Sequence, residues 1–357
     1  MGWTIAFIVI FSIAALVPAI WSIVGLARGD VKYWPGVAGT GFALLLMLFT
    51  VIAIAANWGE CDTRRAPSSE EALVCERDGN AVCHPDVWAM ACGEARGCRG
   101  GTPCPAGSTP VYAYCEKIEP GRVMQPWATW SDLSFIAAGI WLLWWMQRFP
   151  AMGRRGSVEI SADNPMITRG FLSVTYGMVV VFMGPPSMWY HASMKGVPGW
   201  FDSFSVVLWL GFNASYVLYA LCFTMWGWGR GSARPVAVLG FWAALSIGLG
   251  IGMAEGMPSL VGFGVTGGLW GLAEVIYVSC GAGCSAVKYR RTWWLFICNL
   301  ALLAVTMGIW LIYNPGVTPM DWCKDLEVFP GHALFHILAS CSCILTYVSF
   351  SSEQRIR

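Results

Sequence analysis

Charge is the scarcest property of this sequence. Asp, Glu, Lys and Arg together make up 12% of its 357 residues, whereas 56% of the residues are hydrophobic. A soluble domain carries roughly 25% charged residues, so the composition excludes an ordinary water-soluble globular protein. The formal net charge is +1, without the basic footprint of a nucleic-acid-binding protein, and no nucleic-acid partner is expected.

Long apolar runs dominate the chain instead. A membrane-spanning helix needs about 20 apolar residues, and these runs are continuously apolar rather than alternating, which argues against transmembrane strands. The predicted fold class is therefore an all-α polytopic membrane protein with nine transmembrane helices. We predict these helices over residues 3–27, 36–57, 126–147, 168–190, 200–225, 235–254, 259–283, 293–313 and 332–350.

The basic residues predict how the helices are oriented. Short loops rich in Lys and Arg stay in the cytoplasm, whereas long loops cross the membrane regardless of their charge. The short loops on the other side hold only Lys195 and Lys324. This pattern places the N-terminus on the exoplasmic side (periplasmic, lumenal or extracellular) and the C-terminus in the cytoplasm. The residues that define the cytoplasmic side are Arg28, Lys32, Arg148, Arg154, Arg155, Arg169, Arg230, Arg234, Lys288, Arg290, Arg291, Arg355 and Arg357.

The long connection over 58–125 is predicted to be exoplasmic and is rich in cysteine. Such density outside the cytosol is typical of a disulfide-stapled loop, and Cys323 on the same face would make the number of cysteines even. A zinc site in this loop is the weaker alternative, because the loop has no CxxC pair and its only histidine is His84. The cysteines of the loop are Cys61, Cys75, Cys83, Cys92, Cys98, Cys104 and Cys115.

Histidine is also scarce, and three of the four histidines lie at predicted exoplasmic helix ends. His332 and His336 are spaced i, i+4, so one helix face presents both. Ser187 and His191 share this spacing, and Asp202 follows eleven residues later near the start of the next helix. Polar groups inside a membrane are costly and usually functional. We therefore interpret the five residues as one site rather than as interfacial or packing residues.

Three histidines with an open fourth position are the ligand set of a catalytic zinc ion. In such a site Asp202 is the candidate general base and Ser187 the candidate donor to a developing oxyanion. Haem is a weaker alternative, because two histidines one turn apart on a helix cannot be the two axial ligands of one haem. The position near the bilayer surface favours hydrolysis of a lipid amide or ester.

These motifs resemble the alkaline ceramidase family, within the wider CREST group of seven-helix membrane hydrolases. The similar parts are S-x-x-x-H, the aspartate eleven residues later, H-x-x-x-H, and the QPWATWSD segment over 125–132, which is similar to the family's NTxSN segment. The resemblance implies a seven-helix hydrolase core over 126–357. The two-helix hairpin over 1–57 and the loop over 58–125 precede this core. The implied zinc ligands are His191, His332 and His336, and the implied catalytic residues are Ser187 and Asp202.

The chain also departs from the family pattern. Ala128 and Asp132 replace both asparagines of the NTxSN segment, and Ala113 stands where the family's calcium site has an aspartate. The nearby Glu116 and Glu119 are interpreted by default as solvated loop acids. Calcium binding is therefore doubtful.

The expected function is zinc-dependent hydrolysis of ceramide to a sphingoid base and a fatty acid, with a membrane lipid as substrate and the bilayer as surroundings. Two alternatives stay open. One is a lipid ester hydrolase of the phospholipase or GPI-lipid-remodelling type. The other is a non-catalytic receptor or scaffold stabilised by zinc. Protein partners are not indicated by the sequence.

Overall fold

The computed structural model describes most of the apolar part of the chain. Most of the cysteine-rich loop over 58–125 and residue Cys323 lie outside the described residues, so the disulfides stay a prediction. The described residues are 2–30, 33–56, 112–113, 116–117, 123, 125–146, 164, 166, 171–193, 196–226, 234–280, 288–290, 293–313, 331–352 and 354–356.

Each apolar run that was predicted to be a transmembrane helix is helical in the structure. The helix bounds lie within a few residues of the predicted bounds, because the runs end in glycine, proline or charged residues that favour the end of a helix. The helices are α1 (Gly2–Ala27), α2 (Trp34–Ala55), α5 (Pro126–Ser131), α6 (Leu133–Trp145), α8 (Phe171–Ser193), α9 (Gly196–Trp226), α10 (Arg234–Ala254), α11 (Ser259–Cys280), α12 (Trp293–Tyr313) and α14 (Gly331–Ser351).

Within the described ranges, 7 helices are long and apolar enough to cross a membrane, namely α1, α2, α9, α10, α11, α12 and α14. Helix α6 has only 13 residues, and α8 contains two prolines together with serine and histidine residues that lower its hydropathy. The class of all-α polytopic membrane protein is confirmed. The count of nine membrane spans stays a prediction.

The helix predicted over 126–147 is broken at Asp132. This residue ends α5 and begins α6, and the amide of Phe135 bonds the Asp132 carbonyl at 3.1 Å, which makes a tight i to i+3 turn. The backbone of Asp132 keeps helical dihedral angles (φ −63°, ψ −19°), and its side chain makes no capping hydrogen bond to α6. Hydropathy does not register this break, since the apolar run continues on both sides of it.

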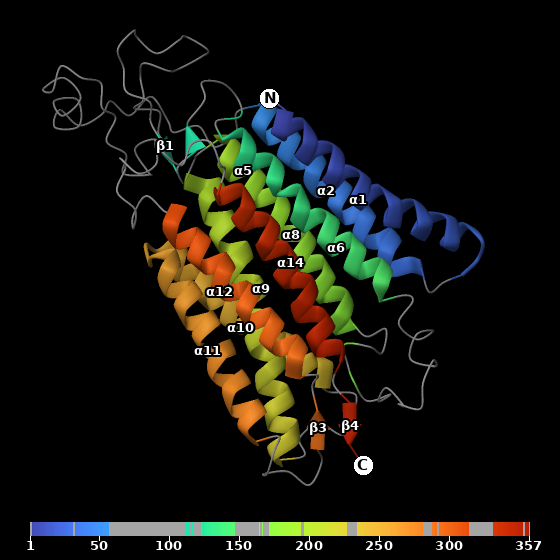
Figure 1. Cartoon of the computed structure of the whole chain (residues 1–357), viewed down its shortest axis with the longest axis vertical. Helices are drawn as coiled ribbons and strands as arrows, with labels where there is room; N and C mark the ends of the chain where they lie inside the picture. Colours follow the sequence, from blue (N-terminus) through green and yellow to red (C-terminus); the bar gives the residue numbers. More distant parts are fainter. Residues whose placement is uncertain are drawn as a thin grey trace, which may run out of the picture.

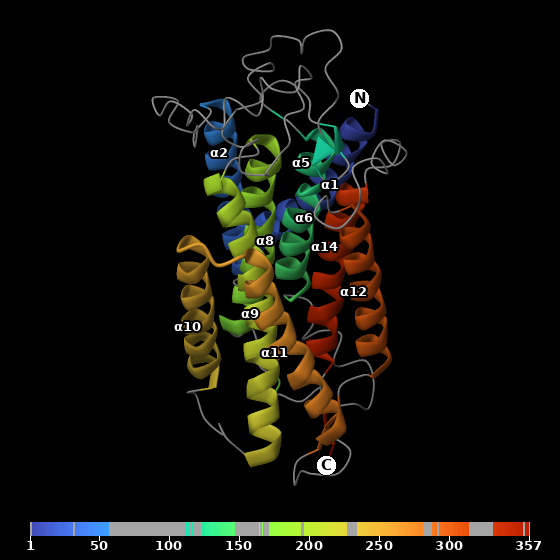
Figure 2. The ribbon, with the colours of Figure 1, turned by 90° about the vertical axis from the view of Figure 1, so that its left-hand side faces the viewer.

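The helices form an upright bundle in two groups (Figures 1 and 2). The inner helices are α5, α6, α8, α9 and α14, and the outer helices are α1, α2, α10, α11 and α12. Helices α1 and α2 pack against α6, α10 and α11 pack against α9, and α12 packs against α14. In Figure 1 the inner helices accordingly stand between the blue pair α1 and α2 and the orange helices on the other flank.

Glycine lets α6 and α8 approach backbone to backbone. A Cβ atom at Gly139 would lie 2.7 Å from the amide nitrogen of Val181, and one at Gly184 would lie 2.9 Å from the carbonyl oxygen of Asp132. Both distances are shorter than a side-chain carbon tolerates. The absence of these side chains brings the end of α8 close to the break between α5 and α6.

The N-terminal hairpin, α1 and α2, packs on the same part of α8. The Thr50 hydroxyl in α2 donates to the carbonyl of Pro185 at 3.4 Å, and Phe49 packs edge-on against Trp189 with ring centroids 5.7 Å apart. Helix α8 continues through Pro185 and Pro186. The hairpin therefore covers α8 directly beside Ser187.

Two short antiparallel strand pairs lie outside the helices. One joins β1 (Tyr112–Ala113) to β2 (Glu116–Lys117), and the other joins β3 (Lys288–Arg290) to β4 (Gln354–Ile356). The first pair lies at the same end of the bundle as the N-terminus, and the second lies at the opposite end with the C-terminus (Figure 1). The membrane side that each end faces stays a prediction.

Candidate metal centre

The structure brings three of the four histidines together inside the bundle. His191 lies in the last turn of α8, and His332 and His336 lie in the first two turns of α14. One ring nitrogen from each residue lies within 4.8 Å of the others, and all three side chains are buried. The three imidazoles could hold a metal ion.

His191 is oriented by Gln125, the residue that precedes α5. The Nδ1 atom of His191 lies 2.7 Å from Oε1 of Gln125, and the backbone amide of Gln125 donates to the carbonyl of His191 at 3.1 Å. An amide oxygen only accepts hydrogen bonds, so Nδ1 carries the proton and Nε2 carries the lone pair. Nε2 of His191 then lies 3.3 Å from Nε2 of His332.

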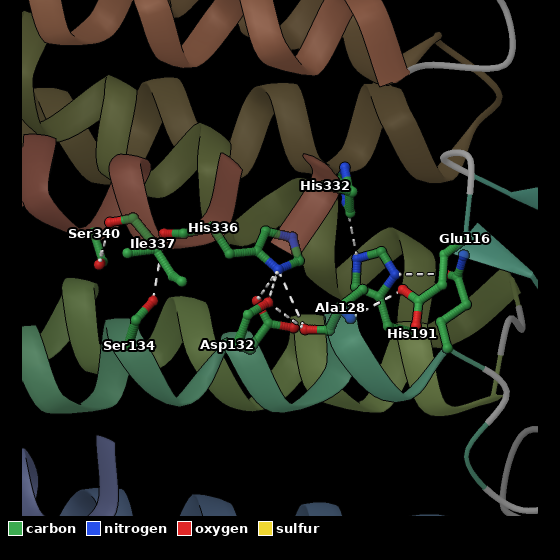
Figure 3. A network of polar contacts seen from close by, with 11 residues as sticks. Glu116, Ala128, Asp132, Ser134, His191, His332, His336, Ile337 and Ser340 are labelled. Carbon is green, nitrogen blue, oxygen red and sulfur yellow. Dashed lines mark hydrogen bonds and ion pairs between the residues drawn. The ribbon is translucent and has the colours of Figure 1, made fainter. Parts of the chain in front are cut away.

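His336 is oriented by the end of α5. Its Nδ1 atom lies 2.9 Å from Oγ of Ser131, 3.0 Å from Oδ1 of Asp132 and 3.3 Å from the carbonyl oxygen of Ala128. Figure 3 shows His336 reaching from α14 toward Asp132 and Ala128, with His332 and His191 beside it. The ring of His336 is thus held on the side facing α5.

Ser187 and Asp202 adjoin the same cluster. The Ser187 hydroxyl interacts with the carboxyl groups of both Asp202 and Asp132, and these two carboxyl groups interact electrostatically with each other. Ser187 lies one turn before His191 in α8, and Asp202 lies in the second turn of α9. Ser187 and Asp202 are therefore connected to the histidines through Asp132, whose Oδ1 lies 3.0 Å from Nδ1 of His336.

The cluster holds carboxyl groups without a basic partner. In the part of the chain that the structure describes, no Lys or Arg side chain pairs with Asp132 or Asp202. Asp132 is fully buried and Asp202 is half-buried, and carboxylates removed from water are costly unless a positive charge or hydrogen-bond donors compensate them. A cation held by the three neutral imidazoles would supply that compensation, so the residues present fit a metal ion.

Helix α5 is anchored by Glu116, a residue of strand β2. Its two carboxylate oxygens accept hydrogen bonds from the backbone amides of Trp127 and Ala128 at 2.7 and 3.0 Å. These are amides of the first turn of α5, and a carboxylate at a helix N-terminus is stabilised by the helix dipole. Interpreting Glu116 as a solvated loop acid is therefore wrong, because it is a buried cap. Glu119 lies outside the described residues.

The three imidazole rings were predicted from the sequence, but the groups that orient them were not. Gln125, Ser131 and Asp132 entered only as part of the segment similar to the NTxSN segment. The sequence did contain an indication of their role, because polar residues at the start of an apolar helix require polar partners. Those partners come from α8 and α14, at sequence separations of 66 residues for Gln125 and His191 and 205 residues for Ser131 and His336.

Comparison of the chain with protein-family models, curated proteins and solved structures found no match.

Proposed function

We propose that this protein is a zinc-dependent intramembrane hydrolase that cleaves the amide bond of a ceramide-like lipid, releasing a fatty acid and a sphingoid base. The observation that carries the proposal is the cluster of three buried imidazoles inside apolar helices, to which Ser187 and Asp202 connect through Asp132. A structural zinc site normally closes with a fourth protein ligand. In the described residues the cluster contains three candidate ligand residues, which supports a catalytic centre over a scaffold.

One pair of ring nitrogens has the spacing expected of two zinc ligands. Two nitrogen ligands at 2.0–2.1 Å from one zinc ion in tetrahedral geometry lie about 3.3 Å apart. The Nε2 atoms of His191 and His332 are 3.3 Å apart. Imidazole is a preferred zinc ligand, and each of His191 and His336 has its other ring nitrogen engaged by an oxygen, as is usual for histidines that bind metal.

The depth of the cluster supports a lipid substrate. His332 and His336 are the second and sixth residues of α14, which places them within about 10 Å of the helix end at 1.5 Å per residue. The polar linkage of a membrane lipid lies near this level, between the headgroups and the hydrocarbon core. A lipid would therefore present its amide or ester to the cluster without leaving the bilayer.

The protein's own residues divide the work of hydrolysis. Zinc, when bound, supplies a Lewis acid that makes water a better nucleophile near neutral pH. Asp202 accepts a proton from the attacking water and delivers it to the leaving amine nitrogen as the carbon–nitrogen bond breaks. Ser187 donates a hydrogen bond to the carbonyl oxygen while negative charge develops on it. The water's oxygen and one of its hydrogens end in the carboxyl group of the fatty acid, and its other hydrogen ends in the amine.

The test measures metal content and lipid products on the same purified, full-length protein. Metal analysis is expected to give about one zinc per chain. Two lipids with the same acyl chain, one joined through an amide and one through an ester, are then supplied in mixed micelles, and fatty acid release is measured. We expect release from the amide lipid, and its loss in His336→Ala.

The control variant is Leu45→Ala in α2, where the side chain is 69% exposed at the bundle surface. It is expected to keep both zinc and activity. Protein without metal, or full activity in His336→Ala, would contradict a zinc-dependent hydrolase. Faster cleavage of the ester lipid would replace the amide substrate with an ester, and zinc binding without fatty acid release from either lipid would favour the receptor or scaffold.

A further inference from the structure

Gln125 is the residue before α5, but its side chain does not cap that helix. The first-turn amides of Trp127 and Ala128 are bound instead by the carboxylate of Glu116. Glutamine is not among the residues preferred at a helix start, where Asn, Asp, Ser and Thr lead. Because another residue satisfies the start of α5, the fully buried side chain of Gln125 is available for a contact with α8.

The backbone of Gln125 is tied to α8 at the residue that its side chain also reaches. Helix α8 ends at Ser193, and the last four carbonyls of a helix have no amide partner within it. The amide of Gln125 donates to one of these carbonyls, that of His191, at 3.1 Å. This bond satisfies a carbonyl at the end of α8 and fixes the level at which Gln125 stands beside His191.

The side chain of Gln125 makes the second contact, with the imidazole ring. Its Oε1 atom lies 2.7 Å from Nδ1 of His191, which is the distance of a good hydrogen bond. The two contacts join the same pair of residues, one through the backbone and one through the side chains. Gln125 therefore determines both where the ring stands and which of its nitrogens faces the cluster.

We propose that Gln125 is a positioning residue of the metal centre, whose amide oxygen accepts the Nδ1 proton of His191 and keeps the lone pair of Nε2 available to the metal. The inference rests on the proposed metal site, and it names a residue outside the five predicted from the sequence. Either nitrogen of a neutral imidazole can carry the proton, and the hydrogen bond made by one nitrogen decides the form. A side-chain amide does this without adding a buried charge, which would be costly inside the bundle.

The backbone and side-chain contacts can be separated by substitution. Gln125→Met keeps the backbone amide and nearly the same side-chain length but has no acceptor oxygen. Gln125→Glu keeps an acceptor oxygen at the same place, whether its carboxyl group is charged or neutral. A role limited to packing would be preserved in Gln125→Met, whereas a role in orienting the ring would be lost there and restored in Gln125→Glu.

The test is zinc affinity, measured by titrating metal-depleted full-length protein against a chromophoric chelator. Gln125→Met is expected to bind zinc roughly 10- to 100-fold more weakly, the usual effect of removing a group that orients a metal ligand. Gln125→Glu is expected to bind zinc more tightly than Gln125→Met. The control is Ser193→Ala, because this buried hydroxyl in the last turn of α8 donates to the backbone carbonyl of Trp189 at 2.7 Å and not to a ring.

A second measurement reports the proton directly. The chain has only 4 histidines, so the nitrogen-15 spectrum of histidine-labelled, metal-free protein is simple, and the spectrum of His191→Ala identifies the signal of His191. We expect His191 to be protonated at Nδ1 in the wild type, and less so in Gln125→Met.

Three results would overturn the inference while leaving the proposed function in place. They are a wild-type His191 protonated at Nε2, a Gln125→Met variant that binds zinc as tightly as Ser193→Ala, and a Gln125→Glu variant that binds zinc no better than Gln125→Met. Wild-type protein that binds no zinc would instead overturn the proposed function and, with it, the inference.

Discussion

The inner and outer helices are both strongly apolar, yet they place their side chains in opposite surroundings. In the outer helices Leu45 and Val236 are 69% and 70% exposed, whereas Leu142 and Leu143 of the inner helix α6 are fully buried. Exposed leucine and valine are stable where the surroundings are lipid rather than water. The outer helices therefore provide the surface toward the bilayer, and the inner helices provide the core.

Hydroxyl groups of both regions bond either within their own helix, as Ser215 does to the carbonyl of Gly211 in α9, or across to another helix, as Thr50 of α2 does to Pro185 in α8. In the outer helices Ser22, Thr266 and Thr306 donate to a carbonyl four residues earlier in their own helix. In the inner helices the hydroxyl of Tyr176 reaches the carbonyl of Cys343 at 2.7 Å, across to another helix. A bond within one helix satisfies a polar group without fixing a neighbour. Bonds between helices fix where the inner helices stand, and this is the condition for a metal site whose ligands come from two of them, α8 and α14.

The largest expected contrast between the regions is in their acidic residues. Asp202→Asn in α9 removes the proposed general base and is expected to lower kcat roughly 100- to 10,000-fold, while zinc content stays at the wild-type level. The matched variant is Glu255→Gln, at an exposed position just after the outer helix α10. Fatty acid release and metal content are measured on both. Equal activity of the two variants would remove Asp202 from the chemistry.

The next contrast concerns serine. Ser187→Ala is expected to lower kcat roughly 100- to 1,000-fold, the range for loss of one donor to a developing oxyanion, with a smaller change in KM. Ser22→Ala in α1 is the control, because that hydroxyl is buried but bonds only to Pro18 within its own helix. Complete loss of activity together with loss of zinc in Ser187→Ala would indicate a structural role instead.

Glycine gives a contrast in stability. Gly139→Ala places a methyl group against the backbone of α8 and is expected to lower the free energy of unfolding by roughly 1–3 kcal/mol through overpacking. A Cβ atom at Gly240 in α10 meets nothing within 4 Å, so Gly240→Ala is expected to be neutral or slightly stabilising. Denaturant unfolding of both variants in the same detergent measures the difference. If Gly139→Ala and Gly240→Ala changed the unfolding free energy equally, α6 and α8 would not approach as closely as described.

The smallest effect is expected on the outer surface. Val236→Ala in α10 trims a side chain that is 70% exposed, and it is expected to change the unfolding free energy by no more than about 0.5 kcal/mol. The same unfolding measurement applies, with Leu142→Ala in α6 as the buried counterpart. A large loss of unfolding free energy in Val236→Ala would show that this face of α10 is covered in the membrane, for example by a second copy of the chain.

Part of the site was predictable because its signal is local. The i, i+4 spacing places His332 and His336 on one face of any helix that contains them, and the same spacing relates Ser187 to His191. The break at Asp132 and the cap by Glu116 were not predictable from the apolar pattern. Aspartate and glutamate at those positions are compatible with solvated loops, and only the neighbouring helices show that both side chains are buried.

The sequence by itself determined that this is an all-α membrane protein, where the apolar helical runs lie, and which scarce polar residues require an explanation. These properties follow from the length and composition of single segments, because hydropathy and helical spacing act along the chain. Only the tertiary structure decided which helices are inner and which are outer, since apolar side chains facing lipid and apolar side chains facing the core look alike in sequence. It also decided that Asp132 turns to His336 and Gln125 to His191. Those contacts join residues far apart in the chain, so they exist only once the helices have packed together.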